Sequence, residues 1–226
     1  MLLGVSHRPV LFGVPAWDSA LTICADRPAA LGSRHMSRSA NATPPRKQNA
    51  NNLVWLDLEM TGLDLDRDVI LQVALIVTDP ELAPLEQYTC DVWQPEAALA
   101  QMNPFVRAMH DKTGLVERVR RSTMELRRVE QALLEVVSGW CPYGAVLCGN
   151  SIWQDRRFVD RYMPGFSAYL TYRLIDVSSI KLLAKTWFGP GAVYEKPALH
   201  EHDALVDIEN SIAELAHYKK TLFRLG

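Results

Sequence analysis

Residues 53–60 read Leu-Val-Trp-Leu-Asp-Leu-Glu-Met, an apolar run in which the two acids stand two positions apart. The run predicts a buried β-strand. Side chains two apart on a strand share a face, so Asp57 and Glu59 project together while Leu56 and Leu58 face the other way. Two acids on one face of so apolar a strand repel each other and lose hydration, which a bound cation relieves. A solvent-exposed strand end is the alternative, and the local pattern leaves both open.

The sequence after this strand predicts an α/β domain. A second strand is expected at 69–78 and a shorter third at about 88–93, with Asp79-Pro80 and Pro84 as turn signals between them. The apolar spacing then predicts helices at about 104–111, 122–139, 151–163 and 203–222, with a short buried strand at 145–148. Three leading strands followed by alternating helices and strands indicate a mixed central sheet flanked by helices.

The first 50 residues differ in composition and hydrophobic pattern from the rest of the 226-residue chain. They hold five prolines and show no sustained hydrophobic period, so we expect a disordered N-terminal extension at 1–50 and one folded domain at 51–226. The alternatives for the extension are an organelle-targeting segment, or a start assigned upstream of the true one with Met36 as the plausible true start. The extension carries six Lys/Arg and two Asp/Glu, a charge of +4, which leaves −6 for the domain. So acidic a domain is a poor candidate for gripping long nucleic acid, because that affinity comes from neutralising many phosphates.

The composition is that of an ordinary globular protein, with 48% hydrophobic and 22% charged residues. No apolar run approaches the roughly 18 residues that a membrane helix needs. The four cysteines are scattered and form no Cys-x-x-Cys pair, which argues against a zinc knuckle or a disulfide framework and favours a reducing compartment. We therefore expect a cytoplasmic protein without a membrane partner.

Two further acids lie where they could join the first pair. Asp155 falls in the first turn of the predicted helix after Ser151, which with Gln154 has the spacing of a capping box. An acid there also stabilises a helix dipole, and the pattern alone does not separate the two roles. Asp207 lies beside the apolar face of the last predicted helix, five residues after His202. His202 would then lie at or just before the start of this helix, over a site that Asp207 reaches from the helix. The alternatives for His202 are an exposed loop histidine or a small metal cluster with His200.

Five segments in register resemble the DEDD exonucleases of the histidine subclass, and within them the oligoribonuclease family. They are Val54–Leu63, Gly114–Val119, Gly149–Phe158, Tyr172–Ser178 and Asp207–Leu215, and the resemblance spans about residues 51–225. A bare Asp-x-Glu is a weak signal, whereas five segments together are specific. The resemblance implies an RNase H-like exonuclease fold, which agrees with the order of elements expected above.

The resemblance also implies roles for individual residues. The four acids Asp57, Glu59, Asp155 and Asp207 would hold two divalent cations, Mg²⁺ or Mn²⁺, and His202 would be the general base. Six further positions would bind the substrate: Leu63 as a wedge between bases, Phe105 in the base pocket, His110, Ser151 and Arg173 at the 5′ phosphate, and Tyr172 from a neighbouring subunit. The implied assembly is a homodimer in which Tyr172 and Arg173 complete the partner's site.

The function implied is a 3′→5′ exoribonuclease that degrades very short RNA, from dinucleotides up to about five nucleotides, to 5′-mononucleotides. A DNA-directed or proofreading exonuclease of the same superfamily shares the metal ligands and is the first alternative. A catalytically inactive exonuclease-like module that binds RNA or protein is the second. Loss of an acid or of the histidine would indicate the inactive module, but all five residues are present in the sequence.

Overall fold

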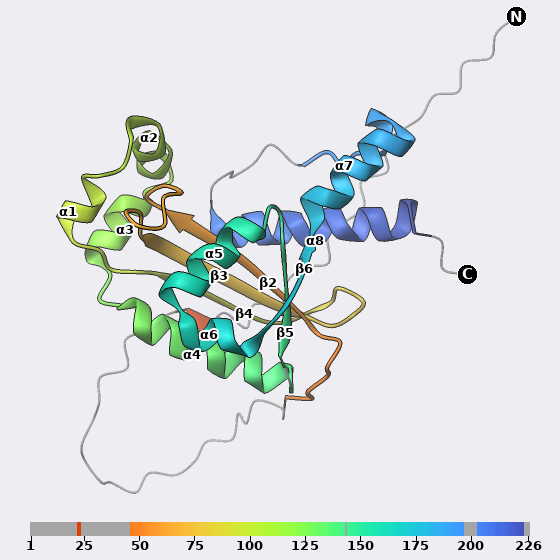
Figure 1. The fold of residues 1–226 in the computed structure, drawn as a ribbon, viewed down its shortest axis with the longest axis horizontal. Helices are drawn as coiled ribbons and strands as arrows, with labels where there is room; N and C mark the ends of the chain where they lie inside the picture. The colour runs from red at the N-terminus through yellow and green to blue at the C-terminus, as the bar shows by residue number, and fades with distance from the viewer. Residues whose placement is uncertain (1–21, 24–45, 143, 197–202, 224–226) are drawn as a thin grey trace, which may run out of the picture.

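The computed structural model describes residues 22–23, 46–142, 144–196 and 203–223, which form a twisted mixed sheet with helices on both faces (Figure 1). The strands are hydrogen-bonded in the order β1-β4-β3-β2-β5-β6. Strands β2, β3 and β4 pair antiparallel, whereas β5 pairs parallel to both β2 and β6. Their bounds are Thr22–Ile23 for β1, Leu53–Met60 for β2, Ile70–Thr78 for β3, Pro84–Asp91 for β4, Ala145–Gly149 for β5 and Leu170–Asp176 for β6.

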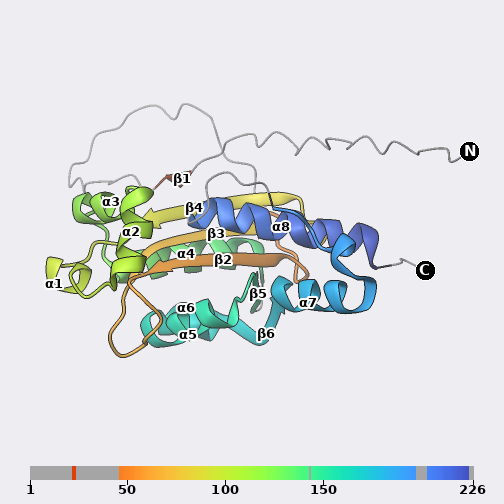
Figure 2. The ribbon, with the colours of Figure 1, turned by 90° about the horizontal axis from the view of Figure 1, so that it is seen from above.

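Eight α-helices are described alongside the sheet. Their bounds are Glu96–Leu99 for α1, Pro104–Lys112 for α2, Leu115–Arg121 for α3, Leu126–Trp140 for α4, Trp153–Tyr162 for α5, Pro164–Tyr169 for α6, Val177–Phe188 for α7 and Ala204–Thr221 for α8, with a 3₁₀ turn at Pro190–Ala192. Helices α1 to α3 gather at one end of the sheet, and α7 lies at the opposite end beside α8 (Figures 1 and 2).

The alternation of side chains along β2 divides the core into two layers. Leu56 and Leu58 belong to a large apolar cluster that includes Val129 of α4 and Phe158 of α5. Trp55 points to the other face, where it joins the buried apolar residues of α8 in a second cluster. Because Asp57 and Glu59 share the face of Trp55, they lie on the side of the sheet that α8 covers.

The sequence located the main elements and missed several short ones. The strands at 53–60, 69–78 and 145–148 and the four predicted helices are present within a few residues of their expected bounds. The third strand was placed too late, because Pro84 begins β4 rather than ending a turn; proline is tolerated at the first residue of a strand. Helices α1, α3, α6 and α7 and strands β1 and β6 were not predicted as elements. The mixed central sheet flanked by helices that the sequence predicted is present.

The contacts of the domain begin before residue 51. The Arg46 side chain forms an ion pair with Glu86, and the Gln48 amide donates a 2.7 Å hydrogen bond to the carbonyl of Ser138. The backbone N–H of Asn49 donates to the last residue of α4. The disorder expected for residues 1–50 stays a prediction, since most of that stretch lies outside the described residues.

Within the described ranges, no helix combines the length and the apolar character that crossing a membrane requires.

Candidate active site

Three carboxylates from two distant segments of the chain meet over the centre of the sheet. Asp57 and Glu59 project from β2, and Asp207 approaches from the first turn of α8. One oxygen from each carboxylate lies within 4.8 Å of the others. Glu59 is 7% exposed, so this charge is largely removed from water. The sequence prediction that these three acids would come together therefore agrees with the geometry.

Asp155 reaches the same region from α5 and is 6% exposed. Its Oδ1 accepts a 3.0 Å hydrogen bond from the backbone N–H of Leu58, the residue between the two acids of β2. This bond fixes the start of α5 to β2 beyond the end of the β2–β5 ladder, which runs from Leu53 to Trp55. A backbone amide is thus one partner of the buried Asp155 carboxylate.

The surroundings of these acids disfavour their ionised form. The pKa of Glu59 is raised to about 8, first by burial and then by the nearby Asp207 and Asp203, with Arg118 opposing them. Burial also raises the pKa of Asp155 to about 7, against the lowering effect of the Leu58 N–H. The pKa of Asp57 is raised well above its ordinary value by burial and by the three other acids. Such a cluster is stable in its ionised form when cations are bound between the carboxylates.

The donor set decides which cation suits the site. Carboxylate oxygens are the ligands that Mg²⁺ and Mn²⁺ prefer, whereas zinc sites in proteins usually include histidine or cysteine. Asp57, Glu59 and Asp207 offer oxygen only, and Asp155 adds a fourth carboxylate beside them. The residues present therefore fit hard divalent cations.

Three of the residues predicted to bind the bases and the 5′ phosphate lie on the surface of the domain. Leu63, which follows β2, and Phe105, on α2, are 55% and 78% exposed and accessible to a substrate. Ser151 is exposed too, and its N–H donates to Oδ1 of Asp176 and to Oγ of Ser178, both at 3.0 Å. Its positive φ of 51° is unusual for a serine and is held by these bonds. The roles of these three residues stay predictions.

His110 occupies an unexpected position for a residue predicted to cap a phosphate. Its side chain has no exposed surface; Nε2 lies 2.9 Å from the carbonyl of Met60, and Nδ1 lies 3.8 Å from Oε2 of Glu59. In this arrangement the buried imidazole ring lies beside the Glu59 carboxylate and is not accessible to a substrate. A phosphate contact would require the ring to move, so that role also stays a prediction.

Tyr172 and Arg173 lie on β6, the edge strand at the opposite end of the sheet from β1. Tyr172 is 80% exposed, and the Arg173 guanidinium stacks on its ring at 4.7 Å from the centroid. Both side chains are exposed to solvent, and their contribution to a neighbouring subunit stays a prediction. His202 and His200 lie outside the described residues; the position after them, Asp203, is the N-cap of α8.

Sequence reasoning missed two residues near the acids. Lys196 lowers the pKa of Asp57 and lies 4.0 Å from the buried Glu214, yet the segment before His202 gave no pattern that marked it. Gln72 pairs across the sheet with Glu59 and is 5% exposed. A signal for Gln72 existed, because it is an amide inside the apolar run of β3.

The chain matches the family model described as exonuclease (RNase T) over residues 54–215. It is 44% identical over 180 residues to an oligoribonuclease of Francisella tularensis, an alignment that covers 79% of this chain and 99% of the relative. An oligoribonuclease of Azoarcus is also 44% identical over 181 residues, with the same coverage. An oligoribonuclease of Sodalis glossinidius is 45% identical and is covered over 98% of its length.

Solved structures of exonuclease I share the fold. The enzyme from Methylocaldum szegediense superposes with a TM-score of 0.57 at 21% identity, over 76% of this chain. A metal-free E. coli exonuclease I complex with single-stranded DNA also gives 0.57, at 15% identity over 76% of this chain. The matched region spans about two fifths of each of those chains, 41% and 40%.

Proposed function

The chain belongs to the RNase T exonuclease family, and we propose that it is a 3′→5′ exoribonuclease of very short RNA, from dinucleotides up to about five nucleotides, with 5′-mononucleotides as products. The observation that carries the proposal is the carboxylate cluster of the half-buried Asp57 and Asp207 and the buried Glu59, with the buried Asp155 beside it. The oligoribonuclease relatives, covered almost end to end, support RNA as the substrate.

The four acids would hold two divalent cations, Mg²⁺ or Mn²⁺. When bound, such cations supply an activated water and electrostatic stabilisation of the charge that develops on the phosphate and the leaving oxygen. The chain's own contribution is to hold the carboxylates in place, since their burial and mutual repulsion disfavour the ionised form unless cations are bound. The rigid β2 backbone orients Asp57 and Glu59, the Leu58 N–H orients Asp155, and the α8 helix carries Asp207 over the sheet.

His202 would act as the general base that removes the proton from the attacking water. Its unperturbed pKa near 6.5 suits that role at neutral pH. Its sequence position supports the assignment, because it directly precedes Asp203, the N-cap of the helix that carries Asp207. His200 is two positions farther from that helix.

Discrimination for short RNA would come from a few contacts around the centre. Leu63 and Phe105 present exposed apolar surface to the bases, while Ser151, His110 and Arg173 would limit the chain at its 5′ phosphate. The formal charge of −2 agrees with a substrate that offers few phosphates, because long nucleic acids are held by many cationic contacts.

We further propose a homodimer assembled around α7. Leu182, Leu183, Trp187 and Phe188 on this helix are 65%, 42%, 67% and 61% exposed, an apolar surface that a monomer would leave in water. Strand β6, which bears Tyr172, runs directly into α7, so a partner on α7 would also meet Tyr172.

The three described cysteines are buried thiols, which supports a reducing, cytoplasmic location.

The test of the function is the cleavage rate of 5′-phosphorylated RNA from two to about ten nucleotides, with DNA of the same lengths in parallel. We expect the highest rate on dinucleotides, a decline with length, much slower cleavage of DNA and complete loss of activity with excess EDTA. A rate that rises with length, or equal rates on DNA, would instead favour a processive or DNA-directed exonuclease.

The test of the shared site is a mixture of two inactive variants. Asp57→Asn removes a metal ligand and Tyr172→Ala removes the contribution to the neighbouring subunit. If Tyr172 acts across the interface, mixed dimers contain one intact site and recover activity, whereas either variant alone stays inactive. No recovery after subunit exchange would place Tyr172 in its own subunit's site.

Trp187→Glu should shift the dimer to monomers in analytical ultracentrifugation.

A further inference from the structure

Three polar side chains form a row across the sheet on the face that α8 covers. The register pairs Glu59 of β2 with Gln72 of β3, and Gln72 with Asp91 of β4. Residues directly opposite each other on adjacent strands project from the same face. Gln72 interrupts a strand that is otherwise apolar from Ile70 to Val77, and it is 5% exposed. A buried amide in such a strand requires hydrogen-bond partners on both of its ends.

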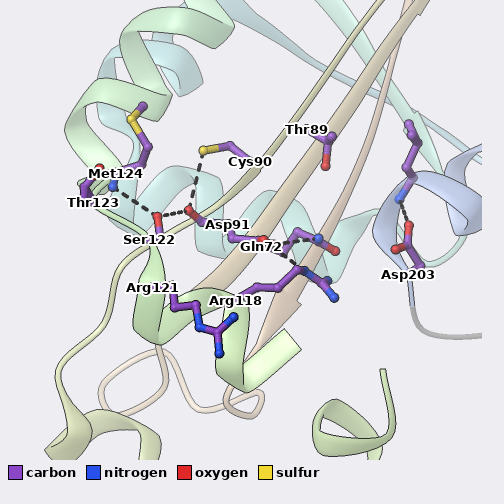
Figure 3. Close-up of a pocket in the computed structure, with 11 residues that line it drawn as sticks. Gln72, Thr89, Cys90, Asp91, Arg118, Arg121, Ser122, Thr123, Met124 and Asp203 are labelled. Atoms are coloured by element: carbon purple, nitrogen blue, oxygen red, sulfur yellow. Dashed lines mark hydrogen bonds and ion pairs between the residues drawn. The ribbon is translucent and has the colours of Figure 1, made fainter. Parts of the chain in front are cut away.

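Both ends of the Gln72 amide are occupied, which fixes its orientation. Nε2 donates a 2.8 Å hydrogen bond to Oδ1 of Asp91, and Oε1 accepts a 3.3 Å bond from the backbone N–H of Ala204. Asp91 is in turn held by the guanidinium of Arg118, whose Nε lies 3.0 Å from Oδ2 (Figure 3). The row therefore runs from α3 through β4 and β3 to the first residue of α8.

The bond to Ala204 completes the start of α8. The first N–H groups of a helix have no partner within it and must be satisfied from outside. Asp203 accepts from Leu205 and Val206 through its carboxylate and from Asp207 through its carbonyl. The N–H of the fully buried Ala204 is satisfied by Gln72 instead. One bond of the helix start is thus made to the sheet itself, three residues before Asp207.

We propose that Gln72 is a positioning residue of the metal site: held by Asp91 and Arg118, it fixes the start of α8 on the sheet and so sets the place of Asp207 relative to Glu59. This inference rests on the proposed function, in which Asp207 and Glu59 share cations. Gln72 touches neither substrate nor the reacting atoms. Its effect passes through the Ala204 N–H and one helical turn to the Asp207 carboxylate.

Asp91 and Arg118 border a cavity of about 510 Å³, which Asp203 and other residues also line (Figure 3). Water that enters this cavity can solvate Asp91 or Arg118 after a substitution, so changes at Asp91 should leave the fold intact. Ala204 is fully buried and has no such access, so loss of the Gln72 carbonyl leaves its N–H without an acceptor.

The experiment compares the wild type with Gln72→Leu, which keeps the side-chain volume and removes both hydrogen bonds. We expect the Mg²⁺ concentration for half-maximal dinucleotide cleavage to rise about five- to tenfold, as the loss of one buried hydrogen bond implies. Saturating Mg²⁺ should restore kcat to within about twofold, with KM for RNA unchanged, because neither bond contacts the substrate. Calorimetry of Mn²⁺ binding without RNA should show the same loss of affinity, and amides 204–207 should exchange hydrogen faster.

The matched rescue exchanges the acid and the amide, with Gln72→Glu and Asp91→Asn combined. The carboxylate introduced on β3 still offers an acceptor to Ala204. The amide introduced on β4 can donate to that carboxylate while its oxygen accepts from Arg118. The net charge is unchanged, so metal affinity and exchange should return close to wild type. Gln87→Leu, a part-buried glutamine on β4 outside the row, is the control and should leave both readouts unchanged.

Three outcomes would overturn the proposal: unchanged metal affinity and exchange in Gln72→Leu, a defect that saturating Mg²⁺ does not restore, or a swapped pair no better than Gln72→Leu. If Gln72→Leu does not fold, Asp91→Ala should shift metal affinity in the same direction by a smaller factor, and no shift would refute the inference. A wild type that neither binds Mn²⁺ nor cleaves RNA refutes the proposed function instead; the exchange of amides 204–207 then still decides whether Gln72 holds the helix.

Discussion

Glu59→Gln is expected to make the metal-free protein more stable, and increasingly so as the pH rises. In the folded chain the pKa of Glu59 is raised from 4.5 to about 8, by burial first and by neighbouring acids second. Between these two pH values the unfolded chain has lost the proton that the folded chain keeps, so the stability of the wild type falls as the pH increases. Above pH 8 the carboxylate is ionised in both states and the full cost is present.

The size of the effect follows from the shift. At about 1.4 kcal/mol per pKa unit, ionised Glu59 costs the folded state about 4–5 kcal/mol at pH 9 and about 1 kcal/mol at pH 5. Glutamine has a similar volume and no charge, so the variant escapes this cost. Its advantage over the wild type should therefore grow by about 3–4 kcal/mol between pH 5 and pH 9. The loss of a like charge beside Asp57 acts in the same direction.

The assay is urea unfolding at pH 5, 7 and 9 in excess EDTA, followed by the same series with 10 mM Mg²⁺, a concentration of roughly the size used to saturate weak carboxylate sites. With metal present the order should reverse, because the wild type gains binding energy that the variant has partly lost. Glu135→Gln, an exposed acid on α4, is the control and should show no pH-dependent gain. An advantage of Glu59→Gln that is the same at all three pH values would refute the reasoning.

Three further predictions concern the reaction. Asp155→Asn should fold normally, since an amide oxygen can still accept a hydrogen bond from the Leu58 N–H. Its kcat should fall by at least about a thousandfold, because a metal ligand contributes several kcal/mol to stabilising the transition state. Circular dichroism measures the fold and steady-state kinetics measures kcat; a loss of under tenfold in kcat would contradict the prediction. His202→Ala should reduce kcat far more than His200→Ala in the same assay, and the reverse order would move the general base to His200. Leu63→Ala should raise KM for dinucleotides several-fold with little change in metal affinity, as expected for a lost apolar contact with a base; an unchanged KM would remove Leu63 from the base site.

The sequence predicted most of the carboxylate cluster because its signals are local. An alternating strand places Asp57 and Glu59 on one face by geometry alone, and the apolar stripe of the last helix placed Asp207 beside the core. The contact of Asp155 with Leu58 could not be predicted, since it depends on how α5 leaves the sheet after residue 149. The same holds for His110, whose complete burial against Met60 follows from the packing of α2 and not from any pattern in its neighbours.

The misplaced elements have local causes as well. Ser151 was expected to cap α5 with its hydroxyl, but the helix starts at Trp153, and Ser151 takes a left-handed conformation bonded to Asp176 and Ser178. Sequence spacing cannot reveal that its preferred partners come from β6 and α7. Helix α7 was missed because its exposed apolar residues blur the amphipathic pattern that marks a surface helix.

The distance along the chain between the acids has a consequence for biosynthesis. Asp57 and Asp207 are 150 positions apart, and α8 packs on strands that are among the first of the domain to be synthesised. Closing so long a loop comes late in folding, because its entropy must be overcome before the contacts stabilise it. A nascent chain that has produced every described strand of the sheet still lacks the Asp207 carboxylate and exposes the apolar surface around Trp55. Nuclease activity should therefore appear only after α8 has docked, which keeps partly made chains from cutting RNA.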